Sequence, residues 1–93
     1  MDIAHEDDGK KGEFYLDRDG KRVAKLQYFH SRDGEINAYH TEVDPSLEGQ
    51  GVGKKLVAEL AKYAQDNDLK VHATCSYANK VMSRSDEYKD LLV

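Results

Sequence analysis

The chain has 93 residues, the size of one domain, and its 39% hydrophobic and 34% charged residues are typical of a globular protein with a strongly solvated surface. It contains no apolar run near the ~20 residues of a membrane span and no signal-peptide region, so we expect a cytoplasmic protein without membrane contact. The net charge of −4, with basic residues scattered among acidic ones, argues against nucleic-acid partners, and a lone cysteine without helically spaced histidines argues against a disulfide or a bound metal.

The N-terminal residues 1–11 include the run Asp7-Asp8-Gly9-Lys10-Lys11 and contain almost no apolar side chains. A segment of this composition has little apolar surface to bury, so it gains little from becoming ordered. We interpret residues 1–11 as a flexible N-terminal segment ahead of a single domain of residues 12–93, with a short first strand as the alternative.

Three strands joined by tight turns are expected next. Runs with strand character cover residues 12–17, 23–30 and 35–43, and an Asp-Gly pair lies in each connection. Asp-Gly pairs favour hairpin turns because glycine tolerates a positive φ. On the third strand we expect two faces, one with Ile36, Ala38 and His40, the other with Tyr39, Thr41 and Val43. This β-branched and aromatic content predicts a strand covered on both faces.

The second half of the sequence changes to a helical period. Apolar residues recur at helical spacing at Leu56, Val57, Leu60, Ala61 and Ala64. This pattern predicts an amphipathic helix that begins near Val52 and ends by residues 66–68. Asn67 is expected to close the helix in the left-handed conformation.

A strand and two short helical segments are predicted for the rest of the chain. Residues 69–74 have strand character, and a short helix is expected around Tyr77, Val81 and Met82. Ser85 is expected to cap a last helical turn. The resulting order βββαβα predicts an α+β (α/β-like) fold, with a mixed, mainly antiparallel sheet and helices packed on it.

The most informative stretch is the glycine-rich run from Glu48 to Lys55, between the third strand and the helix. Alternating glycines let the backbone turn sharply and approach a ligand, and the unpaired amides of a first helical turn favour a phosphate. The spacing fits neither a P-loop, which needs glycine at position 48, nor the dinucleotide fingerprint, which needs glycine at position 54. The alternative is a flexible loop that binds nothing.

The run from Val43 to Val57 resembles motif A of the GNAT acetyltransferase superfamily, in which a strand is followed by R/Q-x-x-G-x-G/A and an amphipathic helix. The flanking runs His40-Thr41-Glu42-Val43, Cys75-Ser76-Tyr77 and Asp86-Glu87-Tyr88 are similar to the short, single-domain branch of that superfamily. The sequence departs from the motif at its first position, where Glu48 replaces Arg or Gln and would repel a pyrophosphate. Lys54 and Lys55 are close enough in sequence to offset this charge.

The resemblance implies a minimal GNAT fold that binds acetyl-CoA, with the backbone amides of residues 50–55 around the pyrophosphate. It also implies that the strands ending at Val43 and Thr74 diverge and admit the pantetheine arm. The predicted cofactor-binding residues are Glu42, Val43, Gln50, Gly51, Val52, Gly53, Lys54, Lys55, Tyr77, Asn79 and Lys80. The alternatives are packing of the short helix for Tyr77 and a solvated helix face for Asn79 and Lys80.

Two residues are candidates for the chemistry. Cys75 follows the last strand, where the implied divergence would hold the acetyl group, and its thiol can carry that group covalently. The alternative for Cys75 is an inert packing residue. His40 is the candidate general base, because imidazole titrates near neutral pH, and the alternative is a hydrogen-bonded strand histidine.

We therefore predict an acyl-CoA N-acyltransferase that moves acetyl from acetyl-CoA to an amine on a protein, peptide or small molecule, as a monomer or weak dimer. One alternative is a non-catalytic CoA-binding module, which would keep the glycine loop without needing Cys75. Another is a small interaction domain whose loop binds nothing. Because few residues remain to cover the acceptor, an open acceptor site is expected.

Overall fold

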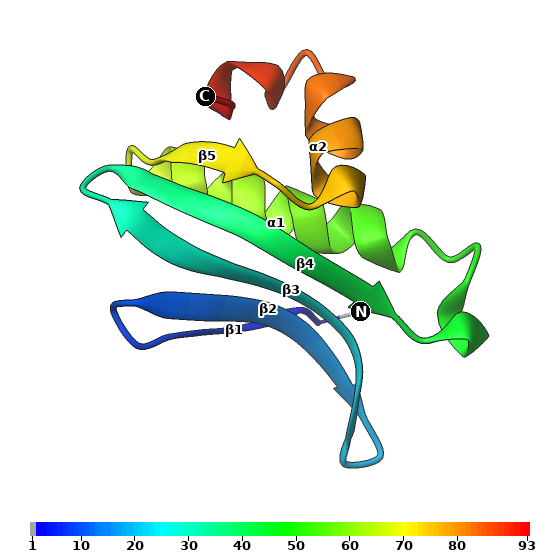
Figure 1. Cartoon of the computed structure of the whole chain (residues 1–93). Helices are drawn as coiled ribbons and strands as arrows, with labels where there is room; N and C mark the ends of the chain where they lie inside the picture. The colour runs from blue at the N-terminus through cyan, green and yellow to red at the C-terminus, as the bar shows by residue number, and fades with distance from the viewer. Residues whose placement is uncertain (1) are drawn as a thin grey trace.

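The computed structural model describes residues 2–93, which form one five-stranded sheet whose strands follow chain order across it (Figure 1). Strands β1 (Ala4–Asp7), β2 (Lys11–Arg18), β3 (Lys21–Arg32) and β4 (Glu35–Val43) are antiparallel, and β5 (Lys70–Ala73) runs parallel to β4. Helix α1 (Val52–Asp66) connects β4 to β5, helix α2 (Ser76–Ser83) follows β5, and two 3-10 turns are η1 (Pro45–Leu47) and η2 (Lys89–Leu91). The predicted α+β class and the order βββαβα after residue 11 are confirmed.

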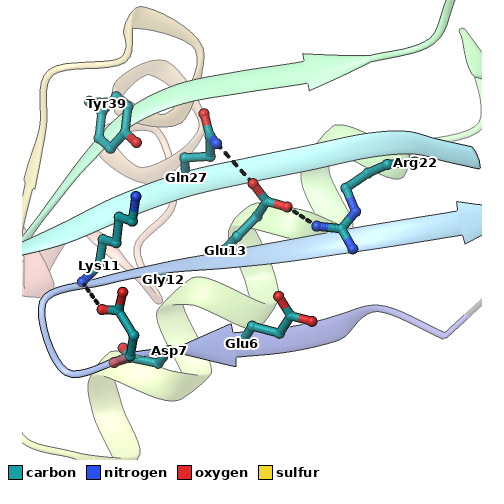
Figure 2. A pocket seen from close by; sticks show the side chains of 9 residues that line it. Glu6, Asp7, Lys11, Gly12, Glu13, Arg22, Gln27 and Tyr39 are labelled. Atoms are coloured by element: carbon teal, nitrogen blue, oxygen red, sulfur yellow. Dashed lines mark hydrogen bonds and ion pairs between the residues drawn. The ribbon is translucent and has the colours of Figure 1, made fainter.

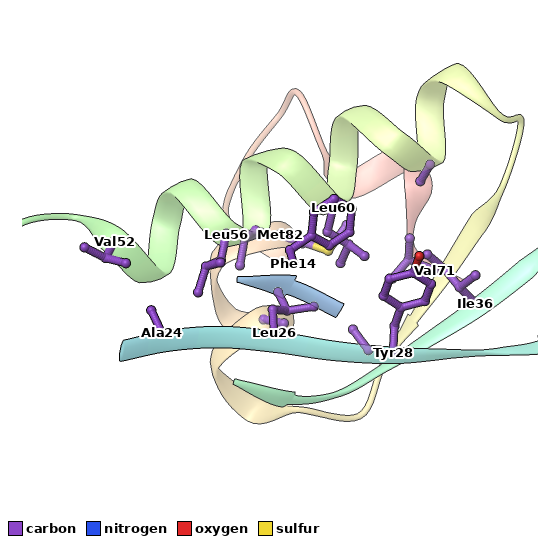
Figure 3. Close-up of a cluster of buried hydrophobic side chains, with 14 of the residues drawn as sticks. Phe14, Ala24, Leu26, Tyr28, Ile36, Val52, Leu56, Leu60, Val71 and Met82 are labelled. Atoms are coloured by element: carbon purple, nitrogen blue, oxygen red, sulfur yellow. The ribbon is translucent and has the colours of Figure 1, made fainter. Parts of the chain in front are cut away.

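The core lies between α1 and one face of the sheet, which we call the inner face (Figure 3). The helical period predicts this packing correctly, since the five apolar residues that recur along α1 are all fully buried. Helix α2 adds Ala78 and Met82 to the same cluster, beside α1 and the β4–β5 edge. Within the described residues, neither helix is long and apolar enough to cross a bilayer.

Residues Ala4–Asp7 of the N-terminal segment form strand β1, as in the alternative of a short first strand, and not a flexible lead-in; Met1 lies outside the described residues. Ala4–Asp7 pairs with β2, from Ala4 opposite Tyr15 to Asp7 opposite Gly12. The strand is held by side chains rather than by apolar burial: the ring of His5 stacks on Phe14 with 4.1 Å between ring centroids. Such long-range contacts are invisible in a local composition count.

A β-bulge at Tyr39 changes the faces of β4. His40 pairs with Gln27 and Ala38 with Tyr28, so Tyr39 is the extra residue on β4. Ile36 and Ala38 therefore face inward as expected, whereas His40 joins Tyr39 on the opposite face, and Thr41 turns inward opposite Leu26. The expected placement of His40 beside Ile36 is wrong, because simple alternation assumes that the strand has no bulge.

The face of the sheet opposite α1, which we call the outer face, is exposed. Phe29 and Tyr39 project from it with 39% and 42% of their surface accessible. The expectation of a β4 strand covered on both faces is therefore wrong, because among residues 2–93 the helices pack only toward the inner face and the β4–β5 edge. Aromatic content alone does not distinguish a buried face from an exposed one.

Two predicted caps also differ. Asn67 closes α1 with φ −114°, and the left-handed residue is the next one, Asp68, with φ +54°. Asn67 instead uses its side-chain Nδ2 to donate to the Tyr63 carbonyl at 2.8 Å. The last helical turn is η2, whose cap is Tyr88 rather than Ser85; the Ser85 carbonyl accepts from the backbone amides of Tyr88 and Lys89.

Candidate functional site

The site lies where β4 and β5 separate. Their ladder ends at the pair Ala38–Ala73, and one further backbone bond joins the Cys75 amide to the Ala38 carbonyl at 3.0 Å. Beyond it, within the described residues, no backbone hydrogen bond joins residues 39–43 to β5 or α2. The divergence implied by the family resemblance is therefore present and leaves the β5 side of β4 unpaired. We call this opening the gap.

The backbone of β4 presents unpaired groups to the gap. The Asp44 amide donates to the Val23 carbonyl of β3 at 2.8 Å, so the alternate residues Val43 and Thr41 direct their backbone N–H and C=O groups to the other side. An extended ligand with amide groups can pair with this exposed edge as an added strand does.

A cleft of about 620 Å³ adjoins the gap on the inner side. Its lining combines the end of β4, the glycine loop, the first turn of α1 and one residue of α2: Thr41, Val43, Leu47, Glu48, Gly49, Gly51, Val52, Gly53, Lys54 and Tyr77. Six of these residues belong to the predicted cofactor-binding set, and the other four were not predicted from the sequence.

The glycine loop places a helix N-terminus at this cleft. Gly49 and Gly51 have φ values of +78° and +73°, which non-glycine residues rarely adopt. Gly51 is the N-cap of α1, so the cap supplies no side chain, and the first turn carries no acidic residue. The amides of Val52, Gly53 and Lys54 are thus available, with the positive end of the helix dipole, for an anionic ligand.

Tyr77 packs against the first turn of α1. A Cβ at Gly53 would lie 2.6 Å from the Tyr77 hydroxyl, so glycine at this buried position leaves room for the ring in its present orientation. The phenol lines the cleft with 39% of the residue exposed, and burial raises the pKa of its hydroxyl. Tyr77 therefore forms one wall of the cleft and keeps its proton at neutral pH.

The four missed lining residues are Thr41, Leu47, Glu48 and Gly49. Thr41 faces the cleft because of the bulge at Tyr39, which no local sequence signal revealed. Leu47 is buried at the end of η1, which Asp44 caps by accepting from the Ser46 amide at 2.9 Å. The run Pro-Ser-Leu between the strand and the glycines indicates a turn, and this pattern could have predicted the position of Leu47.

Five predicted cofactor-binding residues lie outside the cleft lining. The Gln50 amide side chain points back to the Ser46 carbonyl at 3.5 Å, and Asn79 donates to the Ala73 carbonyl at 3.3 Å, which ties α2 to β5. Lys55 and Lys80 are exposed and do not line the cleft.

Glu42, the fifth, lies on the outer face. Its carboxylate lies 3.5 Å from the Lys25 ammonium and 3.4 Å from His40 Nε2. The hydrogen bond from His40, followed by the charge of Lys25, lowers the pKa of Glu42. The carboxylate is therefore ionised at neutral pH and directed away from the cleft.

The two predicted catalytic residues lie on different faces of β4. The half-buried Cys75 is the N-cap of α2, and its thiol donates to Thr41 Oγ1 at 3.3 Å, at the closed end of the gap. His40 projects from the outer face beside Glu42. Cys75 thus adjoins the cleft through Thr41, whereas His40 can be reached only from the other side of the sheet.

The divergent β4–β5 pair and the glycine loop at the N-terminus of α1 together form a cleft with open backbone donors, and the family comparison assigns a family to this fold. The model for the GCN5-related N-acetyl-transferase family matches residues 13–91. The chain belongs to this family.

Named relatives cover different shares of the chain. Protein NATD1 of Xenopus tropicalis is 30% identical over 84 residues, which are 89% of this chain and 77% of the frog protein. Protein NATD1 of Homo sapiens is 32% identical over 66 residues, 71% of this chain and 48% of the human protein. The chain thus spans about half the length of the human relative.

Solved structures share the fold. A GCN5-like protein of Staphylococcus aureus superposes with a TM-score of 0.78 at 34% identity, over 99% of this chain and 87% of that one. The ribosomal-protein-alanine N-acetyltransferase of Brucella melitensis superposes with a TM-score of 0.63 at 17% identity, over 83% of this chain and 62% of that one. The expected minimal GNAT fold is confirmed.

Proposed function

We propose that the protein transfers an acetyl group from acetyl-CoA to an amine. The observation that carries this proposal is the joint presence of an uncapped helix N-terminus and an unpaired strand edge on the same cleft. The first suits a pyrophosphate and the second suits the amides of a pantetheine arm. Family membership supports an acetyltransferase in general, and acetyl-CoA and the amine acceptor are the finer proposal.

Each part of the cleft has a role in this scheme. The amides of Val52, Gly53 and Lys54 hold the pyrophosphate, and the backbone of Thr41 and Val43 aligns the pantetheine arm along β4. Acetyl-CoA, when bound, supplies an activated thioester carbonyl. The acceptor nitrogen, once it has lost its extra proton, attacks this carbonyl carbon. The carbon–sulfur bond then breaks and the thiolate leaves with its electron pair.

Proton transfers complete the reaction. The Tyr77 hydroxyl lines the cleft and is protonated at neutral pH, so it can donate to the leaving thiolate. His40 is on the outer face, where it can take the proton of an incoming ammonium group. The attacking nitrogen loses its second proton as the amide forms, and a proton returns to the Tyr77 oxygen, so the net reaction releases one proton. His40 and Tyr77 thus serve as base and acid on opposite sides of the gap.

The alternative mechanism passes through a covalent intermediate on Cys75. The thiol lies beside Thr41 at the closed end of the gap and at the N-terminus of α2. In this route Cys75 takes the acetyl group and passes it to the amine in a second step. Cys75→Ala then abolishes turnover, and acetyl-CoA alone leaves a hydroxylamine-labile acetyl group on the protein. Unmodified protein, with turnover retained in Cys75→Ala, assigns Cys75 to packing.

Thermal unfolding with and without CoA tests the donor site. A ligand that binds only the folded protein, at a hundredfold excess over its dissociation constant, raises stability by about 2.7 kcal/mol. We expect an increase in Tm with CoA and acetyl-CoA, and consumption of acetyl-CoA with a panel of amines. No change in Tm at millimolar CoA would refute the proposal. Binding without turnover across the panel would identify a CoA-binding module instead.

A further inference from the structure

The outer face is the open approach to the gap. On the inner side, the donor cleft and the core between α1 and the sheet occupy the space next to β4. On the outer side, within residues 2–93, no helix or strand packs over β3 and β4. An acceptor that meets a donor held in the cleft therefore has to come across the outer face.

The bulge in β4 shapes this approach. It turns the adjacent side chains of Tyr39 and His40 to the outer face, at the first residues of β4 that are no longer paired with β5. Tyr39 stands beside Phe29 of β3 with 5.7 Å between ring centroids, and both rings are about two-fifths exposed. Tyr39 thus stands at the outer rim of the gap, and the exposed ring of Phe29 lies beside it on β3.

A shallow groove continues from Tyr39 across β3 and β2 (Figure 2). It encloses about 340 Å³, and four of its nine lining residues are acidic while two are basic. In its floor the Glu13 carboxylate accepts from Arg22 and from Gln27 Nε2, so these three side chains are fixed. Tyr39, which belongs to β4, forms one wall of the groove. The groove and the gap therefore lie on opposite sides of β4.

Resting on the proposed acetyl transfer, we propose that this surface is the acceptor site and that its acceptor is a lysine side chain on a basic segment of a protein. The aromatic pair packs the aliphatic stem of the lysine and attracts its ammonium group. Asp7 and Glu13 already have partners within the protein, so the exposed carboxylates of Glu6 and Asp8 in the groove and of Glu42 at the rim are the ones that complement a positively charged segment.

The openness of the surface favours a macromolecular acceptor over a free polyamine. Sites for small molecules enclose most of the ligand surface, whereas Tyr39, Phe29 and the groove form an open platform. An acceptor held by such a platform needs contacts on both sides of its amine. A protein segment supplies these contacts by lying along the groove while its lysine reaches over Tyr39.

Titration of the ¹⁵N-labelled, CoA-loaded protein with a peptide of about ten residues, one central lysine flanked by arginines, tests the surface without requiring turnover. We expect saturable amide shifts centred on Tyr39, Phe29 and Gln27. A peptide with norleucine in place of the lysine separates the lysine contact from general charge and is expected to bind more weakly. Shifts elsewhere, or shifts with spermidine but not with the peptide, would overturn the proposal.

Kinetics with Tyr39→Ser provides the second test. The acceptor KM is expected to rise about three- to tenfold because the exposed aromatic contact is lost, while the KM for acetyl-CoA is unchanged. Gln65→Ser, on the exposed side of α1, is the matched control and leaves both values unchanged. Turnover of the peptide that is indifferent to Tyr39→Ser overturns the surface but keeps acetyl transfer. Peptide shifts at Tyr39 without turnover by any amine keep the surface and overturn acetyl transfer.

Discussion

The polar groups at the two ends of the sheet differ in whether they have hydrogen-bond partners within the protein. At the β1 end, Asp7 Oδ2 accepts from the Tyr28 hydroxyl at 2.6 Å, His30 Nε2 at 2.8 Å and the Tyr63 hydroxyl at 3.2 Å. His5 Nε2 lies 2.6 Å from the same Tyr28 hydroxyl. At the gap end, the backbone of β4 and the first turn of α1 keep their hydrogen-bonding groups open toward the cleft.

This difference distinguishes polar groups that stabilise the fold from polar groups that remain free to bind a ligand. A polar network whose members all find partners orders the chain and leaves nothing for a ligand. Open donors on a rigid scaffold lower the stability of the free protein but provide binding energy to a guest of the right charge. The β1 end is therefore expected to control the free energy of unfolding, and the gap end to control the affinity for CoA.

The largest effect on stability is expected from Gly12→Ala. A Cβ at Gly12 would overlap the ring and hydroxyl of Tyr28, which is fully buried and bonded to Asp7, so the side chain has nowhere to move. The free energy of unfolding should fall by about 3 kcal/mol in urea denaturation. A loss below about 1 kcal/mol would show that the β1 end is more compliant than its hydrogen bonds suggest.

Gly53→Ala is the matched control at the other end. Its Cβ also meets a tyrosine hydroxyl, but Tyr77 is partly exposed and can rotate away, so the free energy of unfolding should change by less than about 1 kcal/mol. Because the Tyr77 ring lines the cleft, its displacement changes the shape of the cleft. The dissociation constant for CoA should therefore change, while the stability changes little. The same steric contact then acts on stability at one end and on binding at the other.

Gly51→Val is expected to weaken CoA binding strongly. A β-branched residue does not tolerate the φ of +73°, so the loop moves and the amides of α1 lose their alignment. Affinity measured by calorimetry should fall about a hundredfold, which corresponds to about 2.7 kcal/mol. Gly20→Val is the control, since Gly20 has φ +76° in the β2–β3 turn, far from the cleft along the chain. Equal losses of CoA affinity in both variants would contradict a local role for Gly51.

The glycine loop and α1 were predictable because their signals are local: alternating glycines, then a helical period. β1 was only the alternative for its segment, and the face of His40 was not predicted correctly. The strand Ala4–Asp7 depends on Tyr28, His30 and Tyr63, which lie 21 to 56 residues from Asp7 along the chain. The bulge at Tyr39 depends on the pairing of two strands, which the sequence of β4 alone does not specify.

Lowering the pH is expected to remove the stabilising contributions of His5 and Asp7 at the β1 end, one after the other. Burial lowers the pKa of His5 from its ordinary value of 6.5, so the neutral ring stabilises the folded state above that value and the contribution is lost as the pH falls through the folded pKa. For Asp7, burial raises the pKa, but hydrogen bonds from Tyr28, Gly9 and His30 outweigh it and hold the pKa at about 2, against an ordinary value of 3.8. Its contribution is complete above 3.8 and is lost toward pH 2.

Urea denaturation at a series of pH values measures both steps. His5→Gln should flatten the upper part of the decline and Asp7→Asn the lower part, while Asp68→Asn, at the exposed end of α1, leaves the profile of the wild type. An unchanged acid profile in Asp7→Asn would mean that other carboxylates, and not the β1 network, set the acid sensitivity.

The smallest effect concerns Glu48, the residue by which this chain departs from the Arg or Gln of its family motif. Its carboxylate lines the same cleft as Lys54 and the open amides of α1, so it opposes an anionic ligand. Two charges about 8 Å apart in water interact by about 0.5 kcal/mol, so Glu48→Gln should tighten CoA binding about two- to fivefold at low salt. Salt should reduce this gain, because exposed charges are screened. Glu87→Gln, outside the cleft, controls for net charge. Weaker binding by Glu48→Gln would instead identify the carboxylate as an acceptor for a ligand hydroxyl or amino group, since glutamine keeps the size and removes the charge.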